Sequence, residues 1–338
     1  MTPPARTLVT GATGAVGSAV LRRLADAGHD VYGVSSRGGS APRQFAWRIG
    51  AEEPPRELRG PWDLVVHCAA NTRWNLSARR AERDNVAPLR ALLDRTGPRT
   101  HFIHMSSSYA IGLTGSVEPT EVEAYRNTYE WSKATAERLL TAERPDVDIV
   151  RFPIVMGARP DGALERYSGF FWLASALCTG AVPALVGEEK AYLDLVSTDD
   201  VAGYVGELAA GGAPAAPRLS VLGGGDGALQ VGETFDIALD ALNTWRAERG
   251  VGPLLRLPFV GTEQWNRFYL PFAQEYLDRA QLLRVTAFQA YQSYLSMTEP
   301  FEATHQVGDI TSTLYRSVRR WADLHPETAT RIPQPWRP

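Results

Sequence analysis

The chain has little cysteine, no excess of positive charge and no long hydrophobic run. Its 338 residues include two cysteines, Cys68 and Cys178, which offer no metal-ligand spacing and fit buried thiols of a reducing compartment. A formal net charge of -3 at pH 7 gives no basic footprint for a nucleic acid. The aromatic-rich run at residues 169–178 is far shorter than the roughly 20 apolar residues of a membrane helix. We therefore expect an enzyme without a metal ion, a nucleic-acid partner or a membrane span.

A targeting segment and a histidine cluster are also missing. Residues 1–6 lead directly into an expected strand, which leaves no room for a signal peptide. The six histidines form no cluster. The expected location is cytoplasmic, and the Pro/Arg-rich residues 331–338 are predicted to form a surface tail.

The N-terminal part of the chain has the pattern of a strand, a glycine-rich turn and a helix. Thr7–Thr10 suits a buried strand, Ser18–Ala27 has helical periodicity, and Asp30–Ser35 predicts a second strand. Glycines in such a turn let backbone N–H groups approach a pyrophosphate at the helix N-terminus. The pattern predicts a dinucleotide site, with a purely structural glycine turn as the alternative. The expected contacts in this turn are Gly11, Thr13, Gly14, Ala15, Val16 and Gly17.

The second strand lacks the acidic residue with which NAD sites usually bind the ribose hydroxyls. It ends instead in Ser35, Ser36 and Arg37, two hydroxyls and a guanidinium that suit a 2′-phosphate. The alternative is a solvated arginine in a turn. We predict NADP(H) rather than NAD(H) as the cofactor.

A tyrosine and a lysine stand four residues apart where a helix is expected to begin. Tyr129 and Lys133 would share one helix face, and an ammonium beside a phenol favours the phenolate. This spacing arises often by chance, so an amphipathic helix start is the alternative. The upstream strands supply further groups: Trp62–Ala70 ends in small residues, and His101–Ser108 ends in three hydroxyls. Parallel strands end on the same edge of a sheet, where a ligand crevice lies.

Taken together, these motifs resemble those of an extended short-chain dehydrogenase/reductase, in the NAD-dependent epimerase/dehydratase superfamily. The resemblance covers roughly the first 210 residues. It is closest to fatty acyl reductases and thioester reductase domains, on the strength of 67–70, 127–129 and 134–140. Further motifs in the family's order lie at 11–17, 85–86, 106–112, 127–133, 151–157 and 194–201.

This resemblance implies an α/β fold, a Rossmann-type doubly wound parallel sheet with a smaller, mostly helical C-terminal part. The expected NADP-binding domain comprises residues 1–160 and about 191–225, and the substrate-binding part about 161–190 and 226–338. A homodimer is left open.

The resemblance also assigns roles to individual residues. Tyr129 becomes the acid/base and Lys133 its partner, which also reaches the nicotinamide ribose. The family's catalytic hydroxyl lies five residues before a closing glycine, and counting back from Gly112 selects Ser107 over Ser106 and Ser108. Further cofactor contacts are expected at Ala69, Ala70, Asn85 and Pro153. For Asn85, helix–helix packing is the alternative.

Departures from the family narrow the substrate. Ser108 and Tyr109 stand where sugar-nucleotide dehydratases carry an Asp-Glu pair, and Ile154 stands where epimerases commonly have asparagine. The aromatic runs 169–178 and 262–276 could line a pocket for an apolar or aromatic ligand, or form ordinary core. The leading hypothesis is an NADPH-dependent reductase of a ketone, aldehyde or acyl thioester in a biosynthetic pathway. The alternatives are a sugar-nucleotide epimerase or dehydratase and a non-catalytic NADP-sensing protein.

Overall fold

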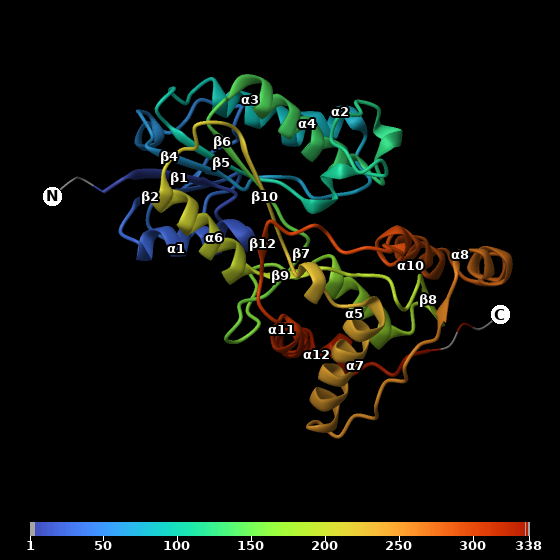
Figure 1. Cartoon of the computed structure of the whole chain (residues 1–338). Helices are drawn as coiled ribbons and strands as arrows, with labels where there is room; N and C mark the ends of the chain where they lie inside the picture. The colour runs from blue at the N-terminus through green and yellow to red at the C-terminus, as the bar shows by residue number, and fades with distance from the viewer. Residues whose placement is uncertain (1–3, 335, 337–338) are drawn as a thin grey trace. The chain divides into compact units, whose positions relative to one another are not determined.

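The structure, a computed structural model, describes residues 4–334 and 336 (Figure 1). The chain forms two compact units. The first contains residues up to 153, 198–222 and 303–305, and the second contains 154–197, 223–302 and 306 onward. The expected division into an NADP-binding domain and a substrate-binding part stays a prediction.

The first unit is built on an eight-stranded sheet with the order β12-β10-β6-β5-β4-β1-β2-β3. From β10 to β3, neighbouring strands pair in parallel. The chain builds outward from β1 to β3, returns to β4 on the other side of β1, and builds outward again. This reversal beside β1 makes the sheet doubly wound and confirms the predicted Rossmann-type fold. The strands are β1 (Arg6–Thr10), β2 (Asp30–Ser35), β3 (Gln44–Ala46), β4 (Leu64–His67), β5 (His101–Met105), β6 (Val147–Arg151), β10 (Arg218–Gly223) and β12 (His305–Gln306).

Helices cover both faces of this sheet. Figure 1 shows α1 and α6 on one face and α2, α3 and α4 on the other. Strands β4, β5 and β6 are buried along their whole length, as expected of central parallel strands. The helices are α1 (Ala15–Asp26), α2 (Ala78–Ala81), a π-helical segment (Glu82–Val86), α3 (Ala87–Leu93), α4 (Thr128–Glu143) and α6 (Thr198–Gly211), with short 3₁₀ turns at Arg56–Leu58, Ser108–Ile111 and Val122–Ala124.

The second unit is mostly helical, as predicted. Its core joins α5, α7 and α11 around large apolar side chains, among them Phe170, Phe171 and Trp245. The helices are α5 (Phe170–Thr179), α7 (Val231–Ala247), α8 (Thr262–Gln264), a π-helical segment (Trp265–Tyr269), α9 (Leu270–Tyr276), α10 (Arg279–Gln289), α11 (Thr311–Leu324) and α12 (Pro326–Ala329), with 3₁₀ turns at Gly225–Gly227 and Gln292–Tyr294. Two small parallel sheets pair β7 (Ile154–Met156) with β9 (Leu195–Ser197) and β8 (Leu185–Val186) with β11 (Phe259–Val260). Within the described residues, no helix is long and apolar enough to cross a membrane.

The prediction that residues 331–338 form a surface tail is wrong for Trp336. Its indole N–H donates to the carbonyl of Ala181 (3.2 Å), and its ring stacks on Phe272 and packs edge-on against Trp265. An aromatic side chain gains more from this burial than from solvent, which ties the segment to the second unit. Of the other tail residues, Arg331, Ile332 and Gln334 are exposed, as predicted, and Pro333 is partly buried. Pro335, Arg337 and Pro338 lie outside the described residues.

Candidate active site

The turn between β1 and α1 is packed so tightly that only glycine fits at two of its positions. A Cβ on Gly17 would lie 2.2 Å from the carbonyl oxygen of Gly11. Gly11 itself has a φ of +67°, and a Cβ there would lie 2.9 Å from the backbone of Ala69. The turn and the segment after β4 therefore meet backbone to backbone, at the carboxyl edge of the sheet.

The first turn of α1 is left open to an anion. Gly14 is the N-cap, no side chain caps the helix, and its first turn holds no acidic residue. Thr13, Ala15 and Val16 lie at this terminus. Its N–H groups and the positive end of the helix dipole can therefore receive a phosphate. The donor set fits the pyrophosphate of a dinucleotide, and the residues predicted from the sequence lie together here.

The turn after β2 holds an exposed arginine, Arg37. The Ser35 hydroxyl donates to the carbonyl of Gly38 (2.9 Å) and accepts from the N–H of Arg37 (3.4 Å), which fixes the turn. Ser36 and Arg37 are exposed, and the Arg37 guanidinium makes no ion pair with any described residue. Its charge is free to bind an external anion.

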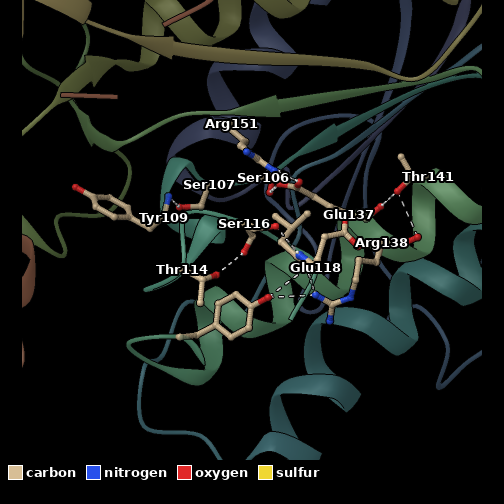
Figure 2. Close-up of polar contacts among 12 residues, drawn as sticks. Ser106, Ser107, Tyr109, Thr114, Ser116, Glu118, Glu137, Arg138, Thr141 and Arg151 are labelled. Atoms are coloured by element: carbon tan, nitrogen blue, oxygen red, sulfur yellow. Dashed lines mark hydrogen bonds and ion pairs between the residues drawn. The ribbon is translucent and has the colours of Figure 1, made fainter. Parts of the chain in front are cut away.

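The three serines after β5 have different surroundings. The Ser106 hydroxyl donates to the Glu137 carboxylate. This carboxylate also accepts hydrogen bonds from two nitrogens of Arg151, the closer at 2.6 Å (Figure 2). Ser107 begins the 3₁₀ turn Ser108–Ile111, and its hydroxyl accepts from the N–H of Tyr109 (3.2 Å). The Ser108 hydroxyl is buried with no partner in the described part of the chain.

These surroundings distinguish Ser107 from Ser106, while the choice of Ser107 over Ser108 stays a prediction. The hydroxyl of Ser106 is committed to a buried ion pair, whereas the O–H of Ser107 remains available as a donor while its oxygen accepts from the backbone.

Tyr129 and Lys133 lie on α4, and the lysine ties that helix to the end of β5. The side chain of Asn127 accepts from the N–H groups of Tyr129 and Glu130 (both 3.1 Å), so the helix begins just before the tyrosine. The Lys133 ammonium donates to the carbonyl of Met105 (2.7 Å) and lies 6.0 Å from the centre of the Tyr129 ring. The lysine thus holds the tyrosine helix against the strand end that carries Ser107.

Burial has the largest effect on the pKa values of Tyr129 and Lys133. It raises the pKa of the Tyr129 phenol above its ordinary value, and the neighbouring Glu130 carboxylate raises it further. Burial lowers the pKa of Lys133 to about 8, with Cys68 and Glu137 acting in the opposite direction. The sequence-based expectation of a lowered tyrosine pKa is reversed in this structure, because desolvation disfavours the phenolate. Tyr129 therefore holds its proton and is set up as a donor.

Several buried polar residues lie near Lys133, a feature that the sequence did not predict. The Thr10 hydroxyl contacts Nδ1 of His67 (2.8 Å) and accepts from the N–H of Ala69 (3.1 Å), and the His67 ring stacks on His104. Burial, aided by Lys133, lowers the pKa of His67 to about 3. Burial raises the pKa of the Cys68 thiol to about 12. These groups stay neutral, which leaves Lys133 as the cation among them.

Asn85 connects two segments of the site. Its amide nitrogen donates to Ser132 (2.8 Å) and to the carbonyl of Asn71 (3.1 Å), and its oxygen accepts from the N–H of Asn71 (2.6 Å). Ser132 lies between Tyr129 and Lys133, so Asn85 positions the helix that carries both residues. Its predicted contact with the cofactor stays a prediction, as does that of Pro153, which is buried just after the end of β6.

Sequence reasoning missed the buried ion pairs of the site. Glu137–Arg151 and Arg126–Glu130 both involve α4, and Arg126 also donates to the carbonyl of Gly112 (2.9 Å), which closes the Ser107 segment. The i, i+4 spacing of Arg126 and Glu130 was a readable signal for the second pair.

Comparison with known proteins identifies the family. The chain matches the NAD dependent epimerase/dehydratase family over residues 7–209, more than half of its length, and so belongs to that family. The resemblance inferred from the motifs is confirmed. The chain is thus a member of the extended short-chain dehydrogenase/reductase superfamily, and this membership indicates a nicotinamide dinucleotide cofactor.

Individual relatives include reductases of different kinds. The chain is 34% identical to a probable low-salt glycan biosynthesis reductase of Haloferax volcanii over 186 residues, 51% of this chain and 60% of that protein. It is 28% identical to fatty acyl-CoA reductase 1 of Xenopus laevis over 177 residues, 41% and 34% of the two chains. The chain thus spans 34% to 60% of the length of these relatives. Its fold is similar to the terminal R domain of the myxalamid PKS-NRPS pathway, with a TM-score of 0.69, 17% identity and coverage of 96% and 92%.

Proposed function

We propose that this family member is an NADPH-dependent reductase that acts on the carbonyl of a ketone, aldehyde or acyl thioester in a fairly apolar, biosynthetic substrate. The observation that carries the proposal is the 2.7 Å contact of Lys133 with the carbonyl of Met105. It joins the helix of Tyr129 to the strand end that bears Ser107, so that acid, second donor and cation belong to one site.

Each of the three residues has a distinct task. When bound, the nicotinamide supplies the hydride that the carbonyl carbon accepts. Tyr129 donates its proton to the carbonyl oxygen, and Ser107 donates a hydrogen bond to the same oxygen. The ammonium of Lys133 then stabilises the phenolate that Tyr129 has become, until a proton from solvent restores the phenol.

Preference for NADPH rests on Arg37. An exposed guanidinium, which forms no ion pair within the described part of the chain, stands where NAD sites have a carboxylate, and its planar fork suits a phosphate. The Ser36 hydroxyl beside it supplies a further donor.

Reduction is favoured over epimerisation or dehydration by the residues that follow the catalytic serine. Dehydratases use an acid and a base where this chain has Ser108 and Tyr109, and Ile154 cannot hydrogen-bond a diphosphate. Sugar-nucleotide epimerisation or dehydration is the second candidate because the family includes such enzymes. Intact Ser107, Tyr129 and Lys133 disfavour a purely NADP-sensing protein.

Replacement of one hydroxyl tests the proposal. Tyr129→Phe should lower kcat by about 10²–10⁴-fold, the usual contribution of general acid catalysis, and leave NADPH affinity unchanged. Tyr204→Phe is the matched control, because the Tyr204 hydroxyl on α6 contacts Ser220 rather than any catalytic residue. Turnover of Tyr129→Phe equal to that of the control would contradict the assignment.

A further inference from the structure

The second unit contains an apolar cavity that the proposed reaction does not use. Its volume is about 730 Å³, and its walls come from the end of α5, the loop at 253–257, residues 268–272, and the C-terminal residues Ile332, Pro333, Gln334 and Trp336. None of the residues assigned to catalysis or to the cofactor lines it. The cavity is therefore a separate feature of the second unit.

The lining of this cavity is uncharged and largely aliphatic. Among the described residues it carries no acidic or basic side chain, and leucines contribute from α5 and from the loop. At its rim, Leu255 is 81%, Ile332 is 74% and Phe268 is 59% exposed. Leaving such side chains in water forfeits about 25 cal/mol for each Å² of apolar surface that a ligand could cover. A contiguous apolar surface of this kind marks a binding site.

The wall formed by the C-terminal segment is firmly held. A Cβ on Gly180 would lie 2.7 Å from the carbonyl oxygen of Gln334, so the segment rests directly on the end of α5. The Trp336 indole donates to Ala181, and its ring lies nearly parallel to Phe272, at 5° with centres 6.2 Å apart. These contacts within the protein hold this wall of the cavity in place.

The size of the cavity selects the kind of occupant. Small-molecule sites enclose about 300–1,000 Å³, a range that includes this volume. The volume and the uncharged lining together fit the apolar part of a small molecule.

We propose that this cavity binds the alkyl chain of a small molecule, independently of the reaction carried by Tyr129. The aliphatic side chains of Leu177, Leu257 and Ile332 cover the chain, and the aromatic faces of Phe272 and Trp336 flank it. A polar head group remains in water beyond the rim.

Calorimetric titration with dodecanoate, with butanoate as the short-chain comparison, tests this site. Saturable binding of dodecanoate and none of butanoate is expected. Leu255→Glu and Ile332→Glu should each weaken dodecanoate binding at least about tenfold, because a carboxylate placed beside the chain would lose hydration. Leu324→Glu is the control: Leu324 is 53% exposed on α11 and lies outside the lining.

Several results would overturn the inference. Absence of saturable dodecanoate binding would do so, as would equal weakening by Leu324→Glu. Sedimentation would also contradict the inference if the wild type were a dimer and the Leu255→Glu variant a monomer. That result would show that a second copy of the chain covers this surface. The Tyr129→Phe variant should bind dodecanoate as the wild type does. The cavity can therefore bind an alkyl chain even if the proposed reductase activity is wrong.

Discussion

Lys133 carries a charge in a place where charge is costly. Its ammonium is buried, donates to the Met105 carbonyl, and is surrounded by the neutral His67, His104 and Cys68. Such a cation persists at neutral pH because its pKa of about 8 still exceeds 7, and because the Glu137 carboxylate favours the charged form. At the scale of the residue, the site is defined by one ammonium beside one protonated phenol.

The pH dependence of kcat/KM should therefore report Lys133. The ammonium loses its proton as pH rises through about 8, so kcat/KM, which follows the free enzyme, should fall above that value. The Lys133→Met variant should have low activity, and its kcat/KM should not show the fall above about pH 8. A wild-type profile that stays flat up to the lysine's ordinary 10.5 would contradict this account.

Arg37 should decide between the two dinucleotides. Arg37→Ala is expected to weaken NADPH binding by about tenfold to a hundredfold, since hydrogen bonds to a charged group contribute about 1.5–3 kcal/mol. NADH affinity should not fall. Arg99→Ala, a change of the same charge at an exposed position before β5, serves as the control. Equal NADPH affinity in both variants would remove Arg37 from the cofactor site.

At the scale of elements, the β1–α1 turn should tolerate no side chain. Gly17→Ala brings a Cβ to 2.2 Å from the Gly11 carbonyl, so the backbone that receives the pyrophosphate must shift. We expect a large loss of NADPH affinity and a lower melting temperature. Gly203→Ala in α6 meets open space and should leave stability unchanged or raise it by up to about 1 kcal/mol. Similar behaviour of the two variants would contradict the packing argument.

The elements of the first unit were largely predictable because local signals and the fold agree. The strand at Asp30–Ser35 has the predicted bounds, and α4 begins at Thr128, where Asn127 caps it. The segment between β3 and β4 contains only the 3₁₀ turn Arg56–Leu58, in line with the shortness of this stretch of sequence. These features depend on neighbours in the chain.

What the sequence could not predict depends on residues far apart in the chain. The Glu137–Arg151 pair and its bond to Ser106 join α4, β6 and the end of β5. The tyrosine pKa was misjudged because a spacing reveals a nearby cation but not the depth of burial. Of the aromatic runs, Phe170 and Phe171 form core, whereas Phe268 and Phe272 line the cavity.

At the scale of the molecule, the cofactor should stabilise the first unit. At a hundredfold excess over its Kd, NADPH should add about 2.7 kcal/mol to the free energy of unfolding. Hydrogen exchange should slow at 11–17 and 35–37, where the backbone and Arg37 receive the phosphates. Binding of NADPH with no protection in either segment would contradict the assigned site.

The balance of NADPH against product tests the central claim most directly. The enzyme would be incubated with NADPH and a panel of apolar ketones, aldehydes and acyl thioesters, and both NADPH absorbance and products would be followed. A reductase with Tyr129 as its acid consumes one NADPH for each carbonyl reduced, and Tyr129→Phe consumes almost none. A substrate that is epimerised or dehydrated with no net loss of NADPH would contradict the account.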